Sequence, residues 1–344
     1  MKIRTVFTKL FLTKPCRVWI ISTLTLGNVF FISTPKNLAD TLSSANPEIK
    51  ANIETKSNPQ TPTDPGVEKV EKIIYVNPQT GIDKPLTANS EAIAQGIPPQ
   101  DSSQMPIVYQ TISFAIAQAT PGTIIQLAPG EYNAEKFPLV VKPGISLRGN
   151  ESGKGKGVEI KGGGLYGNRV FARQNVGIIA QGNAKISGLT ITNDNLGGIG
   201  IWIESGKPSI LNNTFSGNKR EGVFVTGKAT PRIENNRFTK NHNSGVCITK
   251  KAGGEIRNNI FENTGFGISI GGNSTPVVSN NKIYSNRNGI VLTDFAKPQI
   301  LLNNIENNSD YGVAILGQAE PDMQENTFVR NRKKDMFQSI PYSD

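Results

Sequence analysis

Short apolar segments recur along the second half of the chain at a nearly fixed distance. Each unit has one Ile, Val or Met shortly after a Pro or Gly, a second apolar residue after a pair rich in Asn, and then a Gly followed by alternating apolar residues. Such short segments are typical of strands whose side chains alternate between two sides. The glycines repeat at spacings of 23, 22, 23, 22, 22 and 23 residues: Gly177, Gly200, Gly222, Gly245, Gly267, Gly289 and Gly312.

This period predicts a solenoid in which each unit buries its apolar side against its neighbours. Three strands and three turns in 22 or 23 residues describe an all-β fold, the right-handed single-stranded parallel β-helix, with coils about 4.8 Å apart. Leucine-rich repeats would need Leu where this chain has Ile, Val and Phe. A left-handed β-helix would need a six-residue period.

One Asn falls at the same point of each coil. Asn tolerates left-handed backbone in tight turns, and stacked amides hydrogen-bond along a column. We therefore expect these residues to form a structural ladder: Asn213, Asn236, Asn259, Asn281, Asn303 and Asn326. Before the repeats, residues 111–119 place four apolar side chains on one helical face. An amphipathic helix there would cap the first coil, whose strand edges would otherwise be exposed.

The chain resembles a family of bacterial β-helix proteins that carry a domain of unknown function and are common in cyanobacteria. The motifs are Y-V-N-P-Q-T-G at 75–81, A-P-G-E-Y at 128–132, P-G-I-S-L-R-G at 143–149 and the I-x-N-N-x-F repeats. More broadly, the chain is similar to the pectin-lyase-like superfamily and its carbohydrate-binding and sugar-hydrolase (CASH) repeats, over residues 73–337. The resemblance implies the fold, but that superfamily includes lyases, hydrolases, epimerases, esterases and simple binders.

The first part of the chain reads as an export signal. Residues 1–17 are basic without an acid, and the 16 residues that follow are largely apolar, which is typical of a secretory signal and short for a membrane span. We interpret residues 1–39 as a signal peptide or, if uncleaved, an N-terminal anchor. Residues 40–72 read as a disordered linker and 73–344 as one β-helix domain. We expect a protein exported to the periplasm, the cell surface or the medium, touching a membrane only through an uncleaved N-terminus.

The charge adds little to this picture. The net charge is +10, but six Lys or Arg and no acid lie in residues 1–39, so the remainder carries +4. This does not indicate a nucleic-acid partner, and we expect a monomer with no cofactor. Several basic residues fall at one turn, where they would attract an acidic polysaccharide if they line one edge: Lys219, Arg220, His242, Arg287, Arg332, Lys333 and Lys334.

Alternation also predicts which side chains point outward after each glycine. Trp202 and Phe224 fall in one outward row on adjacent coils, where their rings would stack on sugar faces. The next row and the end of the strand add polar groups beside them, and together they form our candidate carbohydrate-binding site: Glu204, Thr226, Thr249 and Lys250. The competing interpretation is that a loop or the C-terminal tail covers and buries this row.

Catalytic residues are not apparent in the sequence. The outward rows hold one carboxylate, Glu204, whereas glycoside hydrolysis uses a pair. The pectinase motifs N-T-D, D-D, G-H-G and R-I-K are absent, and the single histidine is His242. We assign no catalytic or metal-binding residue, and nothing indicates calcium. The favoured function is non-catalytic polysaccharide binding at the cell envelope. The alternatives are a lyase or glycoside hydrolase acting on an acidic glycan, and a structural surface spacer, which a covered aromatic row would favour.

Overall fold

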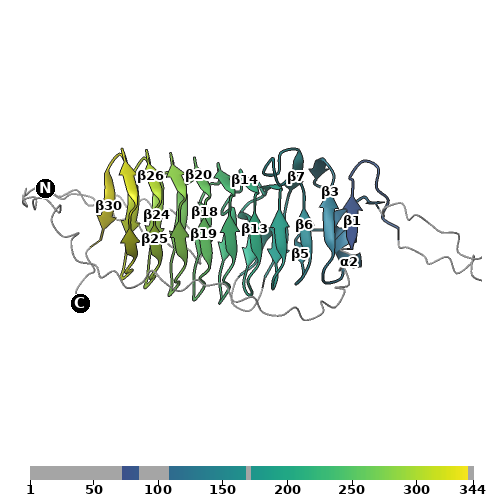
Figure 1. Ribbon diagram of the computed structural model, residues 1–344, viewed down its shortest axis with the longest axis horizontal. Helices are drawn as coiled ribbons and strands as arrows, with labels where there is room; N and C mark the ends of the chain where they lie inside the picture. The colour runs from purple at the N-terminus through teal and green to yellow at the C-terminus, as the bar shows by residue number, and fades with distance from the viewer. Residues whose placement is uncertain (1–71, 85–107, 168–171, 340–344) are drawn as a thin grey trace, which may run out of the picture. The chain divides into compact units, whose positions relative to one another are not determined.

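The computed structural model describes residues 72–84, 108–167 and 172–339, and within them the chain winds into a parallel β-helix (Figure 1). Three sheets, here called A, B and C, run the length of the helix. The expected signal (1–39) and nearly all of the expected linker (40–72) lie outside the described residues. In the described part, no helix is long and apolar enough to cross a membrane.

The strands of each coil follow the order A, B, C. Sheet A holds β2 (Val108–Tyr109), β1 (Ile73–Val76), β3 (Ile124–Leu127), β6 (Ser146–Arg148), β10 (Lys185–Ser187), β13 (Ser209–Leu211), β16 (Arg232–Glu234), β19 (Glu255–Arg257), β22 (Val277–Ser279), β25 (Gln299–Leu301) and β28 (Asp322–Gln324). Sheet B holds β4 (Gly130–Tyr132), β7 (Val158–Lys161), β11 (Thr190–Thr192), β14 (Thr214–Ser216), β17 (Arg237–Thr239), β20 (Ile260–Glu262), β23 (Lys282–Tyr284), β26 (Asn304–Glu306) and β29 (Thr327–Val329).

Sheet C contains every strand that follows or includes a period-marking glycine, together with one strand before them and one after them. It holds β5 (Leu139–Val141), β9 (Gln174–Ala180), β12 (Gly198–Ile203), β15 (Val223–Val225), β18 (Ser244–Ile248), β21 (Phe266–Ile270), β24 (Asn288–Leu292), β27 (Tyr311–Ile315) and β30 (Lys334–Gln338). One further strand, β8 (Gly164–Tyr166), pairs antiparallel with β9. Residues one coil apart are direct neighbours, as Trp202 beside Phe224 and Phe224 beside Cys247 show. The predicted fold class is therefore confirmed.

The core is the column of inward side chains from all three sheets. On sheet B the rings of Phe215, Phe238 and Phe261 stack with centroids 4.7 and 4.6 Å apart and planes within 6° of parallel. Helix α2 (Ile112–Gln118) covers the first coil and buries Ile112, Ala115 and Ile116. The sequence predicted this helix to within about one residue at each end.

The asparagines between sheets A and B bond to one another from coil to coil. The side-chain amide of Asn236 donates to the Asn259 Oδ1 atom (3.1 Å) and to the backbone carbonyl of Ile210 (2.8 Å), while its Oδ1 accepts from the backbone N–H of Asn213 (2.9 Å). The same pattern continues through Asn281, Asn303 and Asn326. The ladder satisfies buried backbone groups that the sharp turn leaves without strand partners.

A second ladder, which we did not predict, runs through the turns between sheets B and C. The column begins at Asn193, whose backbone N–H donates to the Asn218 Oδ1 atom. The backbone N–H of Asn218 donates in turn to the Asn241 Oδ1 atom. Thr264 takes the next position and donates its hydroxyl to the Asn286 Oδ1 atom (2.8 Å). Asn286, Asn308 and Asn331 complete the column. Two of the three corners of the described coils are therefore held by buried amide columns.

The outer face of sheet B carries a compact polar cluster. The Glu262 carboxylate, with 7% of its side chain exposed, accepts from Arg237 Nε (2.7 Å) and from the Tyr284 hydroxyl. Burial alone would raise the pKa of Glu262, but the hydrogen bonds from Tyr284 and Arg237, together with the arginine charge, outweigh it and lower the pKa below 4.5. A carboxyl with a lowered folded-state pKa stabilises the fold above its unfolded pKa and loses that contribution as the pH falls through the folded value.

We expect Glu262→Gln to lower the free energy of unfolding by roughly 1–3 kcal/mol at pH 7, because charged hydrogen bonds are replaced by neutral ones. The difference from the unmodified protein should shrink as the pH falls well below 4.5, where the native carboxylate also becomes protonated. Urea unfolding at pH 7 and pH 3 measures both values. A gap of equal size at the two pH values would contradict a stabilising role for the charged form.

Candidate functional site

The outer face of sheet C contains the aromatic pair that the sequence pointed to. Trp202 on β12 and Phe224 on β15 are register partners, and their rings stack with centroids 4.4 Å apart at 22°. Ile179 and Cys247 extend the same row on the adjacent coils. Alternation along the strands therefore placed these side chains on the correct face and in the correct order.

The aromatic pair is nevertheless not an open surface. Trp202 and Phe224 are both 0% exposed. They belong to a hydrophobic cluster separate from the helix core: Val176, Ile179, Ile199, Trp202, Phe224 and Cys247, bordered by Val140 and Tyr166. The expectation of an exposed sugar-stacking pair is thus not met, and the competing interpretation of a covered row describes the structure.

Strand β8 supplies part of this cover. Because β8 runs antiparallel to β9, it folds back beside the start of sheet C. Tyr166 at its end packs edge-on against Trp202, with ring centroids 5.8 Å apart, and its hydroxyl donates to Glu204 Oε2 at 3.0 Å. Further along the sheet, Phe266, Val291 and Ala314 are also buried. Of the polar candidates, Thr226 and Thr249 are buried, Glu204 is half-buried and Lys250 is exposed.

The carboxylates near this face are held by neighbouring groups. Glu221 is 0% exposed and pairs with Arg220 (Nε to Oε2, 3.2 Å), while Asn243 donates to its Oε1 at 2.8 Å. Arg220 also bonds to Gln174 on β9. This buried network was not predicted, although Gln174 and Arg220 lie 46 residues apart, which is two coil periods. Glu204 accepts a hydrogen bond from Tyr166, so the described residues of this face present no converging pair of free carboxylates.

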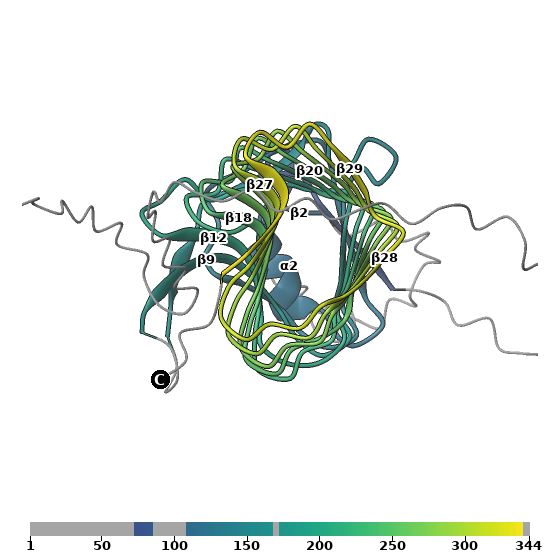
Figure 2. The same cartoon turned by 90° about the vertical axis from the view of Figure 1, so that its left-hand side faces the viewer.

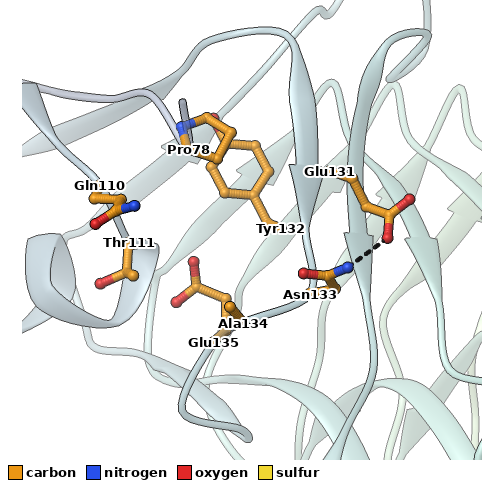
Figure 3. A pocket seen from close by; sticks show the side chains of 8 residues that line it. All are labelled: Pro78, Gln110, Thr111, Glu131, Tyr132, Asn133, Ala134 and Glu135. Carbon is orange, nitrogen blue, oxygen red and sulfur yellow. Dashed lines mark hydrogen bonds between the residues drawn. The ribbon is translucent and has the colours of Figure 1, made fainter. Parts of the chain in front are cut away.

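A small cavity of about 230 Å³ lies beside the capping helix (Figure 3). One carboxylate of its lining, Glu135, accepts from the backbone N–H groups of Ile112 and Ser113, both at 2.8 Å. These bonds satisfy the first turn of α2, so this carboxylate has a structural role. Within the described residues, no group of three or more His, Cys, Asp or Glu side chains lies close enough together to hold a metal ion.

The turns from sheet C to the next strand of sheet A form what we call the C–A edge. One position of this edge has left-handed backbone on five successive coils, with φ values of 68, 65, 65, 56 and 71°: Gly227, Lys250, Gly272, Asp294 and Gly317. Backbone hydrogen bonds join these turns from coil to coil, for example from Asn273 N–H to the Lys250 carbonyl at 2.7 Å. Glycine adopts this conformation freely, whereas other residues pay roughly 1–2 kcal/mol.

The two non-glycine residues at this position differ in their surroundings. The Asp294 carboxylate accepts the backbone N–H of Gly272 at 2.7 Å, which gives it a structural role. The exposed Lys250 ammonium has no ion-pair partner within the described part of the chain, and neither have its exposed neighbours Lys228 and Lys251. Like charges on adjacent strands repel. The C–A edge therefore concentrates positive charge at a cost in both backbone strain and electrostatics.

The basic turn singled out in the sequence lies between sheets B and C and is partly neutralised. Asp310 pairs with Arg287 (3.1 Å) and Lys333 (2.8 Å). Burial would raise the pKa of Asp310, but hydrogen bonds from these two cations and their charges lower it overall. Arg220 is paired with Glu221. Three of the seven basic residues thus have carboxylate partners, which leaves the C–A edge as the better candidate for an anionic ligand.

Comparisons with known proteins agree with the fold. A family model described as a right-handed β-helix region matches residues 197–338. The crystal structure of pectate lyase Pel9A superposes with a TM-score of 0.52, at 15% identity, over 77% of this chain and 78% of that one. A periplasmic alginate epimerase gives a TM-score of 0.41 at 15% identity over 67% and 71%. No curated protein sequence matches. The chain thus has a right-handed parallel β-helix fold. Its resemblance to the pectin-lyase-like superfamily and to one bacterial family stays a prediction.

Proposed function

We propose that this protein is exported and binds a polysaccharide along the C–A edge without cleaving it. The observation that carries the proposal is Lys250, an exposed, unpaired cation held in left-handed backbone at a position where three of the five stacked residues are glycine. Backbone strain of this kind is enriched at functional sites. The pectate lyase with the same fold acts on a polysaccharide, which supports a glycan ligand here.

The arrangement of acidic groups supports binding rather than catalysis. A hydrolase would need two carboxylates placed to protonate a leaving group and to activate water or attack the sugar. Near the outer face of sheet C, Glu221 is buried against Arg220 and Glu204 accepts from Tyr166. At the C–A edge itself, Asp294 accepts a backbone N–H group and Glu320 pairs with Lys297 at 2.7 Å. Among the described residues of this edge, a polymer would therefore meet lysines together with carboxylates that already have partners.

A structural spacer is the second candidate, and the buried aromatic row favours it. If the outer face of sheet C serves only to stiffen the coils, Trp202 and Phe224 need no ligand. A spacer would, however, gain nothing from Lys250 in place of the glycine found at neighbouring coils. The two candidates are separated by whether any glycan is retained.

We expect Lys250→Gly to weaken glycan binding about fivefold, which corresponds to about 1 kcal/mol for one exposed ionic contact. The same substitution should leave the free energy of unfolding unchanged or raise it by up to about 1 kcal/mol, because glycine relieves the left-handed backbone. A glycan array with the full-length protein identifies the ligand, and isothermal titration and urea unfolding measure the two effects.

Asp294→Gly is the matched control. It introduces the same residue at the same position two coils away, but removes an anion instead of a cation. Binding should be retained or become tighter, while the lost bond to the Gly272 N–H lowers stability. If no glycan on the array is retained, or if Lys250→Gly binds as well as the unmodified protein, the proposal is wrong.

A further inference from the structure

The two ends of the β-helix are finished differently. At the first coil, α2 covers the core. At the last coil, β28, β29 and β30 are each the final strand of their sheet, and no described strand or helix pairs with their outer edges. Figure 2 looks onto this end, with the last coil in front and α2 visible through it at the far end. The backbone N–H and C=O groups along these edges are available to another chain.

The core is also open at this end. Met323 and Phe328 are half-buried, whereas Ile300 and Ile305, one coil earlier, are 0% exposed. Met336 on β30 is 47% exposed, while its register partner Val313 is 0% exposed. On the earlier coils, such inward apolar side chains are covered by the next coil. On the last coil, they are partly exposed at the end of the helix. An exposed apolar end bounded by charged residues is typical of a protein interface.

Charges of opposite sign lie on opposite sides of this end. Asp322 on β28 and Glu325 in the turn from sheet A to sheet B are exposed acids. The turn from sheet B to sheet C and the start of β30 are basic, with four exposed cations: Arg330, Arg332, Lys333 and Lys334. On that side Asp335 accepts from the Asn331 side chain at 2.9 Å, and Lys333 pairs with Asp310 of the coil before at 2.8 Å. The end is thus an apolar centre with an acidic flank and a basic flank.

We propose that the last coil binds the last coil of a second copy of this protein in a two-fold symmetric dimer whose axis passes through the C–A edge. Rotation about this axis exchanges the corner between sheets A and B with the corner between sheets B and C. Glu325 then faces the partner's Arg332, while Asp322, which begins β28 near the axis, lies beside the end of the partner's β30. Strand β29 meets its own copy in antiparallel orientation, with Phe328 at the centre.

This axis is favoured over other arrangements by charge. Charged residues at a sheet edge often serve to keep other chains away. Charges that only keep other chains away need not be sorted by sign on opposite sides of the end. If positive and negative charges were mixed, they would favour no single orientation of a partner. The separated flanks instead give one orientation in which Glu325 at the acidic corner meets the basic turn of the partner. The same axis places the lysines of the two C–A edges in line, so that a dimer would present a longer cationic edge. The monomer expected from the sequence is replaced by this proposal.

Charge reversal tests the dimer directly in the full-length protein. Sedimentation equilibrium should show a dimer for the unmodified protein. Glu325→Lys and Arg332→Glu should each raise the dimer dissociation constant at least about tenfold, since each places two like charges across the interface twice. The double variant restores opposite signs and should return to within a few-fold of the unmodified protein.

Glu255→Lys is the control for net charge. It makes the same change as Glu325→Lys but lies on β19, three coils from the end, so dimerisation should be unaffected. A monomer at every concentration would overturn the proposal, and would show that the end is protected by another part of the chain or by its charges. A dimer that both single reversals leave intact would also overturn it. Glycan binding is measured separately, so neither result depends on the proposed ligand.

Discussion

Replacing Gly245 with alanine is expected to lower the free energy of unfolding by about 3 kcal/mol or more, the range of severe overpacking in a core. A Cβ atom at this position would lie 2.5 Å from Cδ1 of Phe261 and 2.7 Å from the carbonyl oxygen of Gly267. The phenyl ring is fixed in the stacked column of sheet B, and the oxygen belongs to the backbone of the next coil. Relief therefore requires two coils to separate, which breaks their hydrogen bonds.

Gly253→Ala is the matched control in the same coil. The nearest atoms to a Cβ there are 3.6 Å away, an ordinary contact, and its backbone is not left-handed. Its stability should be unchanged or slightly raised, because alanine restricts the unfolded chain. Urea unfolding of the two variants measures the difference. If Gly245→Ala proved as stable as Gly253→Ala, neighbouring coils would be able to separate locally without a loss of stability. Close stacking of the coils would then not explain the regular spacing of these glycines.

The same close contact explains why the repeat could be recognised from the sequence. A Cβ at Gly200, Gly222, Gly267 or Gly289 would meet the carbonyl oxygen of the corresponding glycine on the next coil at 2.4–2.8 Å. The coils from Gly177 to Gly312 therefore have glycine at this point, which makes the period visible in the sequence. The strand register follows from the period, which is why Trp202 was correctly placed beside Phe224.

The accessibility of that pair could not be obtained in the same way. Alternation decides the side to which a side chain points, but not what else lies on that side. Strand β8, which brings Tyr166 onto Trp202, falls in a segment without the repeat pattern. Its antiparallel pairing depends on a loop whose path no periodicity describes. The repeat period relates each residue only to its neighbours one coil away. It therefore could not predict that a strand outside the repeat covers Trp202.

The second ladder was missed although its signal was present. Asn218, Asn241, Asn286, Asn308 and Asn331 also recur at whole numbers of coils, but Thr264 interrupts the column. The hydroxyl of Thr264 replaces the missing amide donor, so the physical requirement is a buried hydrogen-bonding group rather than asparagine itself. The left-handed backbone of Lys250 was likewise hidden, since only alignment with Gly227 and Gly272 on the adjacent coils reveals it.

Replacing Asn236 with alanine is expected to lower the free energy of unfolding by roughly 2–5 kcal/mol. The substitution removes the partners of the Asn213 N–H (2.9 Å) and of the Ile210 carbonyl (2.8 Å), both of which are buried. An unpaired buried polar group costs about 1–3 kcal/mol, and no water replaces the amide without opening the coils. Thermal and urea unfolding measure the loss.

Two controls separate the ladder from the turn that contains it. Asn235 is the exposed residue immediately before, with φ of 58°, and Asn235→Gly should leave stability unchanged or slightly raise it because glycine accepts this backbone freely. Asn326, at the half-buried end of the ladder, should lose less on replacement by alanine, since water reaches the groups it leaves behind. Equal losses at Asn236 and Asn326 would mean that the stabilisation comes from each turn alone, and not from the burial of a continuous column of amides.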